Sequence, residues 1–159
     1  WGGGCWRGET GCVGVWQGGT LGVRLGGGLA VPQPTSSPGP GRTGLMVSSG
    51  GGKGGKAVWG KRASWVDYAG ELEGENVGIA ILDHPGNPKH PTYWHSRSYG
   101  LFAANIFGEH DFYNDKSRNG AVTIEPGNAL RFRYRVVIHP GDYLSANVAE
   151  MYQKYSEGK

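Results

Sequence analysis

The chain has 159 residues, a net charge of +3 at pH 7 and 18% charged residues. This length suits one domain that can bury a real core. Lysine and arginine are scattered rather than clustered, so we expect no nucleic-acid partner. No apolar segment approaches the roughly 20 residues of a membrane-spanning helix, and the N-terminus lacks the pattern of a signal peptide, so we expect no membrane partner.

The first third of the chain is rich in glycine, because 21 of the 31 glycines fall in residues 1–60. Residues 32–41 and 50–55 are typical of loops, whereas Thr20–Leu25 alternates as a strand does and Gly44–Ser48 can pair with a neighbour. We therefore predict that residues 1–56 form a few strands with flexible loops, and that residues 57–159 form the β-sandwich core.

Cys5 and Cys12 are the only cysteines. They can close a small disulfide loop or be incidental, and two cysteines alone say little about the redox compartment. Residues 1–60 contain no histidine, which disfavours a metal site here.

Strand patterns dominate the next region. Ser64–Ala69 and Asn76–Leu82 are separated by a turn-rich connection and predict a hairpin. Asn76–Leu82 is apolar on both faces, which favours a strand covered from both sides. Further strands are predicted at Tyr93–Arg97, at Ala121–Glu125 and, as the longest, at Ala129–His139.

The pattern changes to a helical one after residue 141. Apolar residues recur every three or four positions, Asp142 can cap the helix start, and Glu150 with Lys154 makes an i, i+4 pair. Strands in sequence with one closing helix predict an all-β fold, an antiparallel β-sandwich with a C-terminal amphipathic helix on a sheet edge or end.

A candidate site lies in residues 81–112, which hold four of the five histidines. Prolines 85, 88 and 91 predict a stiff, irregular loop, and stiff loops suit ligand-binding side chains. Histidine and charged side chains are costly to bury, so a segment with this many of them is not typical of a hydrophobic core.

Four residues are the catalytic candidates. His95 and Arg97 share one strand face and can bind an anionic or polyhydroxylated ligand, unless that face is simply solvated. Asp83 and His84 stand at a strand end, although Asp83 can equally be a turn residue that satisfies loop amides.

The ligand-binding candidates are Trp94, Tyr99, His90 and Asn105. Trp94 and Tyr99 could form a sugar-stacking platform, with the alternative that such aromatics fill the core. His84, His90 and His95 could instead hold a divalent metal, but their spacing fits no compact ligand pattern, so we expect no metal and no cofactor. No nucleophile or phosphate-loop motif occurs.

From Gly19 onward the chain resembles the C-terminal half of a bacterial family often labelled the PmoA family, or methane oxygenase. The motifs that carry the resemblance are Gly19–Arg24, Val58–Tyr68, Gly78–Pro88, Trp94–Asn105, Phe107–Gly108 and Arg133–His139. The label belongs to a membrane enzyme with several spanning helices, and we interpret it here as mislabelling. The N-terminal half of that family, with its histidine-rich motif, has no counterpart; the glycine-rich residues 1–18 stand in its place.

The resemblance implies part of a sandwich similar to galactose mutarotases, in a secreted or periplasmic protein that acts on carbohydrate. We therefore expect a carbohydrate-binding or carbohydrate-active domain, with acid/base chemistry by His95 and charge stabilisation by Arg97. The alternative is a non-catalytic structural module that self-assembles through open sheet edges.

Overall fold

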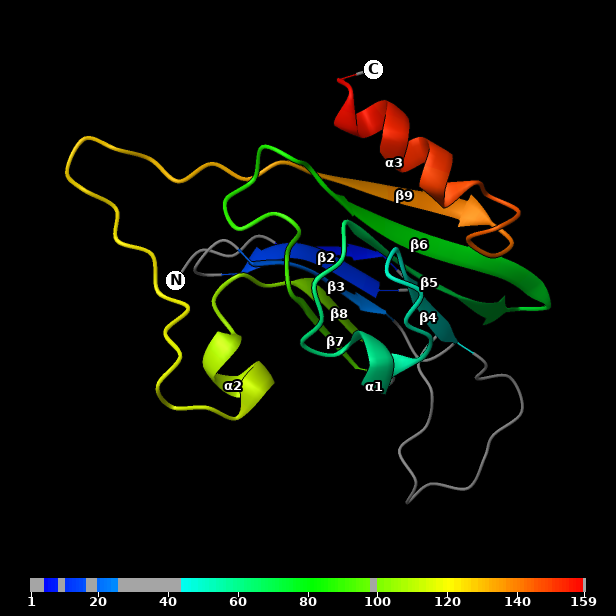
Figure 1. Cartoon of the computed structure of the whole chain (residues 1–159). Helices are drawn as coiled ribbons and strands as arrows, with labels where there is room; N and C mark the ends of the chain where they lie inside the picture. The colour runs from blue at the N-terminus through cyan, green and yellow to red at the C-terminus, as the bar shows by residue number, and fades with distance from the viewer. Residues whose placement is uncertain (1–4, 9–10, 17–19, 26–43, 98–99, 159) are drawn as a thin grey trace.

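Two antiparallel β-sheets pack face to face, and a C-terminal helix covers the far side of one of them (Figure 1). The computed structural model describes residues 5–8, 11–16, 20–25, 44–97 and 100–158, the first three ranges as backbone only. This architecture confirms the predicted all-β sandwich with its closing helix.

The five-stranded sheet combines the glycine-rich segment with strands from the middle of the chain. Its order is β1 (Cys5–Gly8), β2 (Gly11–Trp16), β3 (Thr20–Leu25), β8 (Leu101–Ala104) and β7 (Trp94–Arg97). The pairing of β3 with β8 joins the two regions, from Leu21 opposite Ala104 to Arg24 opposite Leu101. The side chains of Cys5 and Cys12 lie outside the described residues, so their pairing stays a prediction.

The four-stranded sheet has the order β4 (Leu45–Ser48), β5 (Trp65–Leu72), β6 (Glu75–Asp83) and β9 (Tyr134–Pro140). Strands β5 and β6 form the predicted hairpin. Its turn has positive φ at both central residues, 54° at Glu73 and 86° at Gly74, which is the type I′ geometry that matches the twist of paired strands.

The main core fills the space between the sheets. Trp94 and Phe102 come from the five-stranded sheet and lie with ring centroids 5.8 Å apart, while Tyr68 approaches Phe102 edge-on from the other sheet. All three side chains are fully buried. Burial of aromatic rings of this size supplies much of the hydrophobic free energy that holds two sheets together.

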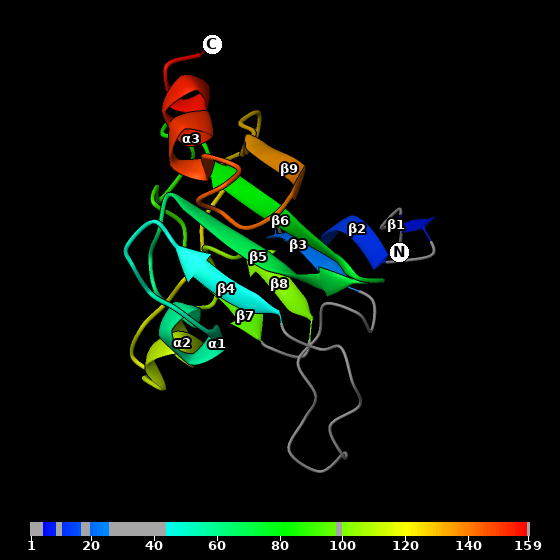
Figure 2. The same cartoon turned by 90° about the vertical axis from the view of Figure 1, so that its right-hand side faces the viewer.

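A second core lies on the outer face of the four-stranded sheet, the face turned away from the five-stranded sheet. Helix α3 (Val148–Ser156) packs there (Figure 2). Its Val148 lies in one buried cluster with Ala80, Leu82 and Trp65. Strand β6 is therefore covered on both faces, as its sequence predicts. The helix covers a sheet face rather than the expected sheet edge or end.

Two short helices flank β7. Helix α1 (Gly55–Val58) and helix α2 (Glu109–Tyr113) lie near this edge of the five-stranded sheet (Figure 1). The turn after α1 is fixed by Gly60, whose amide donates to the Trp94 carbonyl and whose φ of 63° favours glycine.

Three predicted elements differ from the structure. Residues 121–125 form no strand, because no strand in the described part of the chain pairs with them, and Ile124 is half exposed. Strand β9 begins only at Tyr134, so β6, with nine residues, is longer. Asp142 does not cap the last helix, since its side chain closes a turn with Ser145 and α3 begins after Asn147.

Within the described residues, no helix is long and apolar enough to cross a membrane.

Candidate functional site

Asp83 lies at the end of β6 and organises the proline loop that follows. Its side chain is completely buried. One carboxylate oxygen accepts from Asn87 Nδ2 at 2.8 Å, and the other from the Thr92 amide at 2.8 Å with His90 Nδ1 2.7 Å away. Asp83 therefore satisfies the hydrogen-bond donors of the loop, as the alternative interpretation expected. Its carboxylate has no exposed surface that a ligand could contact.

The loop itself is held from both sides. Arg62 donates from Nε to the Pro91 carbonyl at 2.8 Å, and from Nη2 to the carbonyls of Lys89 and His90. The second ring nitrogen of His90 lies 3.4 Å from the Tyr152 hydroxyl of α3. His90 is thus part of the scaffold that ties the loop to the last helix.

His95 and Arg97 share one face of β7, as the sequence predicts, and both pack around Trp59. The Arg97 guanidinium carbon lies 3.3 Å from the Trp59 ring centroid, and the His95 ring meets the same indole edge-on at 4.7 Å. Burial, and then the Arg97 charge, lower the pKa of His95, so this imidazole is neutral at pH 7.

His84 lies elsewhere. It faces Tyr155 of α3, with ring centroids 5.2 Å apart, on the outer side of the four-stranded sheet. Burial, followed by the charge of Arg133, lowers its pKa. The expected convergence of His84 with His95 and Arg97 is therefore not seen, because His95 and Arg97 lie on β7 of the five-stranded sheet, whereas His84 follows β6 of the four-stranded sheet.

The ligand-binding candidates also have separate places. Trp94 is fully buried in the core and donates from Nε1 to the Ala63 carbonyl, which corrects its assignment to a stacking platform. Asn105 accepts the Phe107 amide at 2.8 Å in a turn. Tyr99 lies outside the described residues. In the part of the chain that the structure describes, no three histidine, cysteine or acidic side chains lie together as a metal site.

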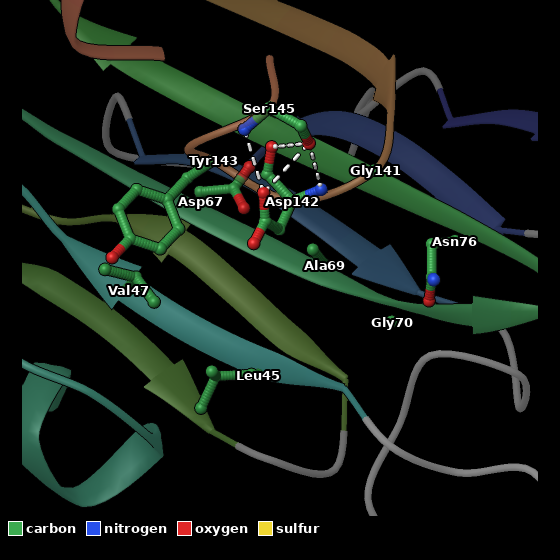
Figure 3. A pocket seen from close by; sticks show the side chains of 10 residues that line it. All are labelled: Leu45, Val47, Asp67, Ala69, Gly70, Asn76, Gly141, Asp142, Tyr143 and Ser145. Carbon is green, nitrogen blue, oxygen red and sulfur yellow. Dashed lines mark hydrogen bonds between the residues drawn. The ribbon is translucent and has the colours of Figure 1, made fainter. Parts of the chain in front are cut away.

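A pocket of about 440 Å³ opens instead on the outer face of the four-stranded sheet (Figure 3). Strands β4, β5 and β6 form its floor, and the turn after β9 forms its wall. Its lining residues are Leu45, Val47, Asp67, Ala69, Gly70, Asn76, Gly141, Asp142, Tyr143 and Ser145. A pocket of this size with an apolar floor and a few polar groups is typical of small-molecule sites.

A buried acid–imidazole pair underlies this pocket. His139 Nε2 lies 2.7 Å from Oδ1 of Asp67, and the two side chains are 3% and 1% exposed. The second oxygen of Asp67, Oδ2, is buried without a hydrogen-bond partner among the described residues. A buried polar atom without a partner costs about 1–3 kcal/mol, so native proteins hold few of them and each has a structural or functional reason.

Strand register explains how the pair forms. Asp67 on β5 lies opposite Ala80 of β6, and His139 on β9 lies opposite Gly78 of β6. A Cβ at position 78 would collide with the His139 imidazole. The glycine therefore lets the ring lie across β6 and reach the carboxylate on the far strand.

The hydrogen-bond partners of His139 determine its proton count. Nδ1 lies 3.1 Å from the Pro140 carbonyl, which only accepts, so Nδ1 carries a proton. One further proton then lies between Nε2 and Oδ1, on either atom. Burial raises the pKa of Asp67 to about 6, although the hydrogen bond and charge of His139 oppose this rise.

Asp142 is the second carboxylate of the pocket and differs from Asp67 in its exposure, its hydrogen bonds and the direction of its pKa shift. It is exposed, and its Oδ1 accepts from the Ser145 amide at 2.9 Å and from the Ser145 hydroxyl at 2.8 Å. The backbone and side-chain bonds from Ser145 lower the pKa of Asp142, so it is ionised at neutral pH.

Sequence reasoning missed Asp67 and His139, although both carry a local signal. Asp67 interrupts a run of large apolar residues, Trp65-Val-Asp-Tyr68, in the middle of a strand, where an unpaired carboxylate is costly. His139 lies in β9, four positions after Arg135 and on the same face of the strand, where a buried imidazole needs a polar partner. Neither signal predicts that Asp67 and His139 contact each other, because their contact depends on the pairing of β5, β6 and β9.

The chain belongs to a family of unknown function, DUF6807, whose pattern matches residues 3–153. No curated protein and no solved structure matches the chain.

Proposed function

We propose that this protein is a carbohydrate-binding domain whose sugar site is the pocket between the four-stranded sheet and residues 141–145. The observation that carries the proposal is the make-up of the pocket. An apolar floor of Leu45, Val47 and Ala69 faces an aromatic wall, Tyr143, and polar side chains stand around them. A pyranose ring needs the same combination, because it has apolar C–H faces and a rim of hydroxyls.

The polar groups are suited to hydroxyls. Asn76 offers both a donor and an acceptor, Asp142 offers acceptors, and the Ser145 oxygen, whose proton is donated to Asp142, offers a remaining lone pair. Bonds within the lining hold these residues in place, since Asp142 and Ser145 bond each other and the Gly141 amide donates to the Asn76 backbone carbonyl at 2.7 Å. A preorganised rim of this kind lowers the entropic cost of binding.

The domain also holds a proton with which it could act on a sugar. The pair of Asp67 and His139 carries one proton between two atoms, and a pKa near 6 for Asp67 allows exchange at physiological pH. We therefore assign any acid/base chemistry to this pair rather than to His95. The buried position of Oδ2 requires the wall at residues 141–145 to move before direct proton transfer.

The setting that we infer is extracellular or periplasmic. The support is the motif resemblance to the family labelled PmoA, which also motivates the comparison with mutarotase-like sandwiches. This part of the proposal is tested by locating the tagged protein in fractionated cells of its source.

The direct test of the site is a nuclear magnetic resonance titration with glucose, galactose, mannose and xylose. Binding should shift the amide signals of residues 69–70, 76 and 141–145. Asn76→Ala should weaken binding several-fold, because Asn76 is exposed and contributes side-chain bonds without supporting the core. Arg97→Ala, which changes the other candidate surface, should leave the titration unchanged. Shifts confined to β7 and α2 would contradict the assignment.

A second candidate function is self-assembly through an open sheet edge. The observation that favours it is β9, an edge strand whose Ile138 side chain is 76% exposed. Sedimentation velocity over a wide concentration range distinguishes the two functions. Growth in size that Ile138→Lys abolishes would support assembly, and a constant monomer mass would exclude it.

A further inference from the structure

We propose that the pocket selects sugars that carry a protonated amino group, the aminodeoxy sugars, over neutral sugars and over sugar acids. This inference rests on the proposed function, because it assumes that a sugar occupies the pocket.

The charges of the lining carry the first step. Among the described residues, the pocket is lined by two carboxylates, Asp67 and Asp142, and by no lysine or arginine. A ligand carboxylate would meet like charges there, whereas an ammonium group would meet opposite ones. The other polar side chains of the described lining are neutral, and the charge of Asp67 is offset by the proton that it shares with His139 beneath the pocket.

Asp142 supplies the contact. Its carboxylate is exposed to the pocket and fixed by the two bonds from Ser145. An ammonium group has three donors and pairs with such a carboxylate without displacing those bonds. Figure 3 shows this residue and Ser145 side by side at the wall, with Asp67 next to them.

Asp67 supplies a second charge beneath the contact. Its Oδ2 is buried and without a partner among the described residues, so it acts on a ligand through its charge rather than by touching it. The ionisable groups that act on Asp67 are His139 of β9 and Asp142 of the following turn. When the proton shared by Asp67 and His139 leaves, the pocket gains a full negative charge in a poorly solvated place, where charges interact strongly.

A ligand cation and this proton therefore compete. At about pH 7 the pair can release its proton and attract the amine, while at about pH 5 the proton stays. The preference for the amino sugar should thus be larger at the higher pH. A neutral sugar should show little change between the two.

The test is a calorimetric titration of the whole chain with glucosamine, glucose, N-acetylglucosamine and glucuronate, at about pH 7 and about pH 5. Glucosamine should bind about 3- to 10-fold more tightly than glucose at the higher pH, and glucuronate most weakly. N-acetylglucosamine has the same ring and no charge, so it should bind like glucose.

Two variants locate the effect. Asp142→Asn should bring glucosamine and glucose within about 2-fold of each other, whereas Asn76→Asp, which adds a carboxylate of the same shape, should widen the preference. Asp111→Asn removes an exposed carboxylate on α2 and should change nothing. Equal binding of glucosamine and glucose by the natural chain would overturn this inference and leave the proposed function standing. No binding of any of the four sugars would overturn both.

Discussion

His139 lies across Gly78 to reach Asp67 on the far strand, with Nε2 2.7 Å from Oδ1. The two residues are 72 positions apart in the sequence and stand on strands that do not touch each other. The pair exists only because the central strand between them carries a glycine at the point where the ring passes. This relationship makes position 78 as important to the site as the two ionisable residues.

The first prediction concerns that glycine. Gly78→Ala should lower the free energy of unfolding by about 1–3 kcal/mol, because the new methyl group and the imidazole cannot occupy the same space. Urea denaturation measures the loss. Gly50→Ala is the matched control, since a Cβ there meets only the Ser48 hydroxyl at 3.9 Å. Equal stability of the two variants would show that His139 does not pass over Gly78.

The second prediction concerns the protonation of the two pocket carboxylates. The carboxyl carbon of Asp67 should titrate near pH 6, and that of Asp142 below its ordinary value of 3.8. Between about pH 4 and about pH 6 the folded protein keeps a proton on Asp67 that the unfolded chain has released. The contribution of this group to stability is therefore lost as the pH rises through that window. Carbon-detected resonance titration measures both values, and a midpoint for Asp67 below about 4 contradicts the burial argument.

The third prediction separates a structural from a catalytic role for Asp83. Asp83→Ala should lower the free energy of unfolding by about 2–4 kcal/mol, because three groups lose the carboxylate that they share as a hydrogen-bond partner. These are the side-chain amide of Asn87, the backbone amide of Thr92 and the imidazole of His90. Asp111→Ala, at an exposed position, should change stability by less than about 0.5 kcal/mol. A variant at position 83 that keeps its stability and loses only sugar binding would restore a direct functional role for Asp83.

The fourth prediction concerns the aromatic cluster at β7. Arg97→Ala should cost about 0.5–1 kcal/mol of stability through the lost contact with Trp59, and it should leave sugar affinity unchanged. Thermal unfolding and a glucose titration of the same sample measure both. A loss of affinity without a loss of stability would move the sugar site to this face.

The elements that sequence patterns predicted correctly are those fixed by local rules. Residues 76–82 are apolar on both faces and do lie between two cores, and the last helix follows its spacing of apolar residues. The alternating residues 129–133 were wrongly included in a strand, because a strand also needs a partner, and these residues have none in the described part of the chain.

The candidate site shows the same limit more clearly. His95 and Arg97 lie on the same face of one strand, as their spacing predicts. The spacing does not predict which of the two sheets contains that strand. Asp83 lies at a strand end, as expected. The loop that follows folds back, and its donors form hydrogen bonds to both carboxylate oxygens of Asp83. The pocket residues Asp67 and His139 meet only through the register of β5, β6 and β9, which no local pattern contains.

The location of the sugar site is tested most directly by a calorimetric comparison of two variants that change different faces of the protein. Asn76→Ala changes the pocket over the four-stranded sheet, and the double variant His95→Ala/Arg97→Ala changes the outer face of β7. We predict that the first variant binds glucosamine at least about 5-fold more weakly than the natural chain, and that the double variant binds glucosamine as tightly as the natural chain does. Unchanged binding by the first variant, with binding lost in the second, would contradict this location of the site.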